Sequence, residues 1–185
     1  QITFLAIFSE LSAVYFILTG FESNLILIVV LLQLGWIFDL MDGMMARYKK
    51  MGFHQPEKPS VKGYYLDAVS DHVLKFIIIG SLSYYLAGQI ENGWLFGLVS
   101  LVIHAITQTE HTMRHYILKN MDNEPKSNLE SSLIFHHVAL IMNNIYLYYL
   151  IFIPLNRVDL FFIIFASGEI ILFLKRVIQF WTADH

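Results

Sequence analysis

Four aspartates stand close together in the sequence, inside segments that are otherwise apolar: Asp39, Asp42, Asp67 and Asp71. Placing one charged side chain at the centre of a membrane helix costs about 2.5–3.5 kcal/mol on insertion scales. Two carboxylates about 4 Å apart also repel each other by roughly 4 kcal/mol at an effective dielectric constant of 20. Divalent cations would offset this repulsion, and ligation by oxygen alone selects a hard ion such as Mg²⁺ or Mn²⁺. We therefore expect the four aspartates to form a metal site.

The first two aspartates share a helix face with small and basic residues. The spacing i, i+3, i+4, i+7, i+8 places on one face the residues Asp39, Asp42, Gly43, Ala46 and Arg47. Gly43 and Ala46 would let a bulky ligand approach the backbone, and Arg47 would pair with a phosphate. Small residues alone more often serve close helix packing. Their combination with the aspartates favours a ligand site.

The other two aspartates, Asp67 and Asp71, lie one turn apart on the next helix, and Gly63 precedes Asp67 by another turn. Helices joined by a loop at one end run antiparallel. At a rise of 1.5 Å per residue, Asp39 and Asp71 would each lie about 12 Å below that end. We therefore expect these two carboxylates to face each other across a seam between the two helices.

The composition points away from a water-soluble protein. The chain has 185 residues, of which 56% are hydrophobic and 15% are charged, whereas soluble domains carry about 25% charged residues. It has no cysteine, which excludes disulfides and thiolate chemistry, and its net charge of -3 gives no electrostatic reason to bind nucleic acid. The sequence begins at Gln1, inside an apolar run. We expect residues 1–185 to form one transmembrane domain of a longer chain.

Apolar runs of about 20 residues predict an all-α fold, an integral membrane bundle of six transmembrane helices. A soluble bundle is disfavoured because runs such as LILIVVLLQLGWIF leave no polar face for water. The expected helices are Ile2–Leu18, Asn24–Arg47, Tyr64–Leu86, Trp94–Leu118, Ser132–Ile153 and Val158–Phe180.

The distribution of basic residues predicts the orientation of these helices. Lys and Arg gather after the second and fourth helices and near the end of the sixth, whereas the opposite loops hold only Arg157. Basic loops face the cytoplasm. We therefore expect the aspartates to open toward the cytoplasmic side.

The motif resembles the signature of the CDP-alcohol phosphotransferases, and every signature residue is present: Asp39-x-x-Asp42-Gly43-x-x-Ala46-Arg47…Gly63-x-x-x-Asp67-x-x-x-Asp71. Six transmembrane helices also suit that family. The segment between the Arg and the next Gly, Tyr48–Lys62, is longer here than is usual in the family. We expect this segment to form a loop over the cytoplasmic mouth of the site.

The resemblance implies a membrane transferase of phospholipid biosynthesis. Such an enzyme moves a phospho-alcohol group from a CDP-linked donor, often CDP-diacylglycerol, to a small or lipid alcohol and releases CMP. Mg²⁺ or Mn²⁺ would be bound by all four aspartates, and Asp71 would also be the general base. Nucleotide contacts are implied for Asp39, Asp42, Gly43, Ala46, Arg47, Ser60, Gly63 and Asp67. Homodimers are common in the family, although no pattern in this sequence indicates one.

Polar residues on the later helices have two interpretations. On the predicted fourth helix a polar stripe contains His104, Gln108, His111 and His115, with Arg114 beside it. Together with Lys75, the stripe would form an acceptor pocket; alternatively, each side chain makes an interhelical hydrogen bond of about 0.6 kcal/mol. Asn144 would line the same cavity. For Glu10 and Glu169, two lone acids inside predicted helices, the sequence leaves open whether they pair with basic groups or line a cavity.

Two other function classes use acidic residues in membranes. A UbiA-type prenyltransferase also binds diphosphates, but its aspartates lie on more widely separated helices of a larger bundle. A divalent-cation transporter would need polar groups along the whole depth of the membrane, whereas these aspartates gather at one end. Neither class explains Gly43, Ala46 and Arg47. The residues around Asp67 and Asp71 match no acceptor pattern, so the acceptor stays open.

Overall fold

The protein is helical throughout the part that its computed structural model describes, residues 2–48, 61–120 and 144–182. The helices in this part are α1 (Ile2–Gly20), α2 (Leu25–Tyr48), α3 (Val61–Gln89), α4 (Gly93–Asn120), α6 (Ile145–Phe152) and α7 (Val158–Thr182). The all-α prediction is confirmed. Long apolar stretches form these helices because, away from water, a helix satisfies its own backbone hydrogen bonds.

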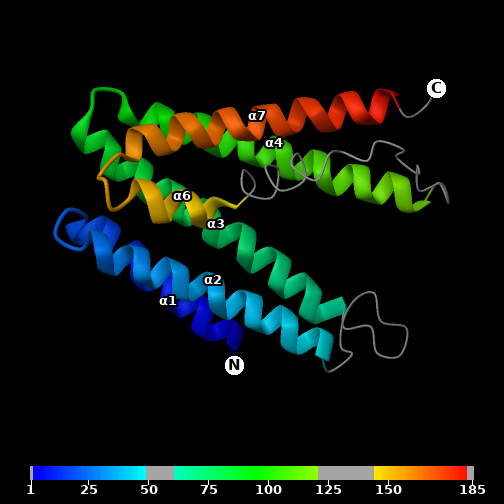
Figure 1. Ribbon diagram of the computed structural model, residues 1–185, viewed down its shortest axis with the longest axis horizontal. Coiled ribbons are helices and arrows are strands. Elements are labelled where there is room, and N and C mark those ends of the chain that lie inside the picture. The colour runs from blue at the N-terminus through cyan, green and yellow to red at the C-terminus, as the bar shows by residue number, and fades with distance from the viewer. Residues whose placement is uncertain (1, 49–60, 121–143, 183–185) are drawn as a thin grey trace.

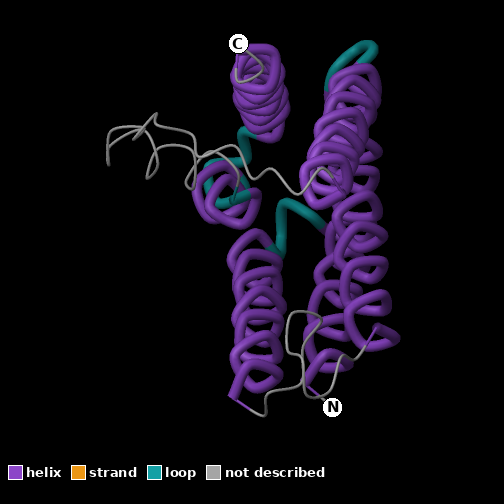
Figure 2. Tube along the Cα trace, turned by 90° about the vertical axis from the view of Figure 1, so that its right-hand side faces the viewer, coloured by secondary structure: helices purple, strands orange, loops and turns teal. Residues whose placement is uncertain are grey.

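The helices form two layers of three, α1–α3–α4 and α2–α6–α7 (Figure 2). The layers meet where α1 packs on α2 and where α4 packs on α7. Consecutive helices run back and forth, so the short turns after α1, α3 and α6 lie at the same end of the bundle (Figure 1). Two of these turns contain an asparagine in the left-handed region, Asn92 (φ 60°) and Asn156 (φ 52°). Asparagine adopts this conformation more readily than most residues.

The core is apolar, and so is much of the outer surface. Ile28 and Leu32 of α2 and Ile78 of α3 are fully buried. On the outward face of α1, in contrast, Phe4 and Phe8 are more than 70% exposed. Large exposed apolar areas on a soluble protein would favour aggregation, whereas lipid covers such faces at no cost.

Among the described residues, two helices are long and apolar enough to cross a membrane by length and composition alone, Ile2–Gly20 and Leu25–Met45. The other long helices are more polar or carry more charge. In α7 the charged residues are Asp159, Glu169, Lys175 and Arg176. The predicted helix order agrees with the structure, but the expectation of six membrane spans is supported by composition for these two helices only.

The predicted helix Ser132–Ile153 is wrong in its start. The helix α6 begins at Ile145, because Asn144 has an extended backbone (φ −96°, ψ 93°) and its side chain accepts a hydrogen bond from the backbone N–H of Tyr146 at 3.1 Å. Asn144 is therefore an N-cap and not a residue of a helix interior. The rest of the predicted segment, residues 132–143, lies outside the described residues.

The helices α3 and α4 pack closely at Gly97. A Cβ at this position would lie 2.1 Å from both Cβ and Oγ of Ser83. Gly80 lies on α3, as Ser83 does, and a Cβ at Gly80 would meet nothing within 4 Å. The two glycines therefore form a matched pair for testing the packing.

We predict that Gly97→Ala forces α3 and α4 apart and lowers the free energy of unfolding by about 1–3 kcal/mol. Gly80→Ala should instead stabilise α3 by up to about 1 kcal/mol, since alanine favours a helix over glycine. Thermal unfolding of both variants in detergent measures the difference. Equal melting temperatures for the two variants would contradict this packing of α3 on α4.

Candidate functional site

A small cavity brings together two of the four aspartates, Asp39 of α2 and Asp71 of α3. Its volume is about 20 Å³, which holds one water molecule or one ion but no nucleotide. The remaining lining comes from three helices: Thr3, Ala6, Ile7 and Glu10 of α1, Ser70 and Leu74 of α3, and Tyr146 of α6. Asp39 and Asp71 thus lie at the same level of the bundle, as their sequence register predicted.

The expected direct seam between α2 and α3 is not the arrangement of the described residues. These helices lie in different layers, and α1 packs against both of them. The space between Asp39 and Asp71 is therefore bounded by α1 on one side and by Tyr146 of α6 on another. The motif alone could not predict that α1 bounds this cavity, because α1 carries no residue of the motif.

Asp71 has a close cationic partner. Its Oδ2 accepts a hydrogen bond from Nζ of Lys75 at 2.7 Å, one turn later on α3. Nδ1 of His72 lies 3.8 Å from the same oxygen. Lys75, expected in an acceptor pocket, is therefore already paired with a carboxylate and fixes the orientation of Asp71.

Asp42 is tied to the start of α1. The hydroxyl of Thr3 donates a hydrogen bond to Oδ2 of Asp42. Thr3 also lines the cavity with Asp39. Sequence reasoning missed Thr3, because the contact joins residues that are far apart in the chain and lies outside the motif.

Glu10 also lines the cavity, and its position is closely defined. Only 3% of its surface is exposed, and its Oε1 accepts a hydrogen bond of 2.7 Å from the hydroxyl of Tyr146. A Cβ on Gly35 would lie 2.5 Å from Cγ of Glu10, so glycine makes room for this side chain. Gly35 stands one turn before Asp39 on α2, which places Glu10 beside the motif.

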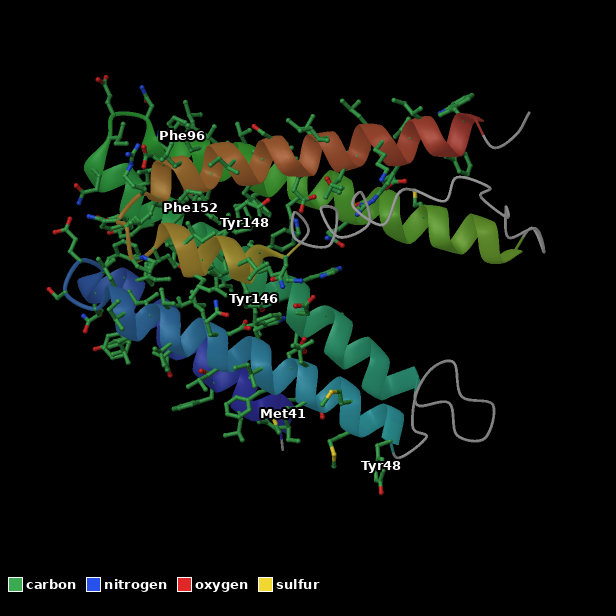
Figure 3. The ribbon with its side chains drawn as sticks, viewed as in Figure 1. Met41, Tyr48, Phe96, Tyr146, Tyr148 and Phe152 are labelled. Atoms are coloured by element: carbon green, nitrogen blue, oxygen red, sulfur yellow. The ribbon has the colours of Figure 1, made fainter. Side chains whose placement is uncertain are left out.

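Tyr146 is held in turn by α2. Its ring stacks on Trp36, with centroids 5.9 Å apart and an interplanar angle of 13°. Its carbonyl accepts a hydrogen bond from Nε2 of Gln33 at 2.8 Å. Tyr146 accordingly points toward α1 and α2, whereas Met41 and Tyr48 point outward from α2 (Figure 3). The sequence left the role of Glu10 open and gave no sign of Tyr146.

His104, the first residue of the polar stripe on α4, lies away from the cavity of Asp39 and Asp71. His104 is 4% exposed, and its Nδ1 lies 3.2 Å from Oε1 of Glu169 on α7. The rings of Phe76 and Phe165 flank it. His104 therefore makes an interhelical contact and is not part of the cavity lining. The pocket interpretation stays a prediction for Gln108, which is half-buried.

Several predicted site residues lie outside the description. Ser60 is outside the described residues, as are the side chains of Ala46, Arg47, Gly63, Asp67, His111, Arg114 and His115. Among the described side chains no three His, Asp or Glu residues are close enough to hold a metal ion. Asp39 and Asp71 nevertheless supply hard oxygen donors to a cavity of ionic size, which fits a cation such as Mg²⁺ or Mn²⁺.

Comparison with known proteins gives one result. The family model for CDP-alcohol phosphatidyltransferases matches residues 1–181. No curated protein and no solved structure matches the chain. Enzymes of this family are metal-dependent integral membrane proteins that transfer a phospho-alcohol from a CDP-alcohol and release CMP. Since the match extends over nearly the whole chain and includes the motif around the cavity, the protein belongs to the CDP-alcohol phosphatidyltransferase family.

Proposed function

We propose that the protein transfers a phosphatidyl group from CDP-diacylglycerol to an alcohol at the cytoplasmic side of a membrane. The observation that carries the proposal is the common cavity of Asp39 and Asp71 in a chain of this family. The prenyltransferase and transporter alternatives have no observation in their favour. The basic residues near the ends of α2 and α4 support the cytoplasmic assignment.

Asp39, Asp42, Asp67 and Asp71 would hold Mg²⁺ or Mn²⁺ in this proposal. The ion would neutralise the donor diphosphate and stabilise the phosphate of the departing CMP. Thr3 fixes the carboxylate of Asp42 through its hydrogen bond, and partners of this kind orient ligands for a cation. The nucleotide would lie along Gly43 and Ala46, whose small size would let it approach the backbone, with further contacts from Arg47, Ser60 and Gly63.

Asp71 would act as the general base. The acceptor oxygen forms a bond to the phosphorus of the phosphatidyl group while the bond from that phosphorus to CMP breaks. The hydroxyl proton passes to the carboxylate of Asp71. Lys75, 2.7 Å from Oδ2, keeps this carboxylate in one orientation. Ser70 and Leu74 of α3 line the same cavity.

We predict that Asp71→Asn lowers the rate of CMP release by about 10²–10⁴-fold, since the amide cannot accept the proton. At saturating Mn²⁺, binding of CMP should be largely retained, because Asp39, Asp42 and Asp67 remain as metal ligands. Asp159→Asn is the matched control: Asp159, in the first turn of α7, pairs with Arg157 at 2.8 Å, at the opposite end of the bundle. This variant should release CMP at the wild-type rate. Turnover of Asp71→Asn at that rate would remove Asp71 from the base role.

We also predict that CMP together with Mn²⁺ raises the melting temperature of the protein in detergent. A ligand at 100 times its Kd adds about 2.7 kcal/mol of stability. At limiting Mn²⁺, Asp39→Asn should reduce the shift, because a carboxylate of the site is lost. A prenyl diphosphate serves as the control ligand. Stabilisation by the prenyl diphosphate with none by CMP would contradict the proposal.

A further inference from the structure

We propose that the acceptor is an uncharged alcohol and that Glu10 and Tyr146 bind its hydroxyl-bearing end. The inference rests on the transferase function proposed above and names the class of acceptor for the same site. It starts from Glu10, a buried carboxyl group that the four-aspartate motif does not include.

The position of Glu10 is built by three helices. The side chain comes from α1, Gly35 of α2 makes room for it, and Tyr146 of α6 donates a hydrogen bond to it. Burying a carboxyl group costs free energy unless its partners compensate. A simple tether between α1 and α6 would need no carboxyl group on the cavity that Asp39 and Asp71 share. The location of Glu10 on that cavity therefore favours a role in binding.

A second tyrosine of α6 packs against Tyr146, with ring centroids 5.8 Å apart. Tyr149, one turn after Tyr146 on α6, is 0% exposed, and its hydroxyl has no hydrogen-bond partner. A buried hydroxyl without a partner is unfavourable. The hydroxyl of an alcohol can both donate and accept hydrogen bonds, so it matches the phenol of Tyr146 and the carboxyl group of Glu10, which both line the cavity.

The charges around the cavity indicate that this alcohol carries no phosphate. Three acidic side chains line the cavity: Glu10, Asp39 and Asp71. Lys75, a cation next to them among the described side chains, is already paired with Asp71 at 2.7 Å. A phosphate is bound by unpaired Arg or Lys side chains, and near Glu10 it would meet a carboxyl group. An uncharged hydroxyl at this position would lie beside Asp71, which takes its proton.

The substrate test uses acceptors in matched pairs that differ by one phosphate: glycerol and glycerol 3-phosphate, inositol and inositol phosphate, diacylglycerol and phosphatidate. CMP release from CDP-diacylglycerol is measured with Mn²⁺. The uncharged member of a pair should have the higher kcat/KM, by about tenfold or more. Preference for the phosphorylated member would overturn the inference.

The same test separates the inference from the proposed function. If CMP with Mn²⁺ stabilises the protein but no uncharged acceptor supports CMP release, the acceptor inference fails and the nucleotide site stands. If CMP neither stabilises the protein nor is released, the proposed function itself fails.

The residue test compares two buried glutamates. Glu10→Gln and Tyr146→Phe should raise KM for the uncharged acceptor by about tenfold and leave KM for CDP-diacylglycerol within about twofold. Glu169→Gln is the matched control, because Glu169 is 1% exposed but pairs with His104 away from the cavity. It should leave both KM values within about twofold. Equal changes in both KM values for Glu10→Gln, or a lower melting temperature alone, would reduce Glu10 to a structural tether.

Discussion

Acidic side chains among apolar helices need hydrogen-bond or ion-pair partners, and this need determines much of the structure. Burial of a carboxyl group without partners costs several kcal/mol, and four acids in the bundle each have a polar partner. Asp42 binds Thr3, Asp71 binds Lys75, Glu10 binds Tyr146, and Glu169 lies against His104. Three of these pairs join different helices, so the acids also fix how the helices pack.

The helix α1 has the largest part in this arrangement although it carries no motif residue. It packs on both α2 and α3 and supplies Thr3 and Glu10 to the cavity between their aspartates. The motif provides the reacting groups, and α1 and α6 set their spacing. A family signature therefore identifies the chemistry, whereas the helices outside it shape the place where an acceptor would bind.

Local patterns predicted what depends on neighbouring residues. Apolar runs predicted α1, α2 and α3 closely, and helical spacing predicted that Asp39 and Asp71 share one level. The start of α6 was missed because the cap at Asn144 depends on a single side-chain contact. Glu10 and Tyr146 are 136 positions apart, and the fit of Glu10 against Gly35 depends on the packing of two helices. Contacts between residues so far apart in the chain leave no periodic pattern in the sequence.

The central claim is that Asp39 and Asp71 serve one site, and Mn²⁺ affinity tests it most directly. Electron paramagnetic resonance can measure that affinity for the wild type, Asp39→Asn, Asp71→Asn and the double variant. If both carboxylates bind the same ion, the double variant should lose far less affinity than the sum of the two single losses, since residues that share a ligand do not act additively. Additive losses would show two separate sites and would contradict the account.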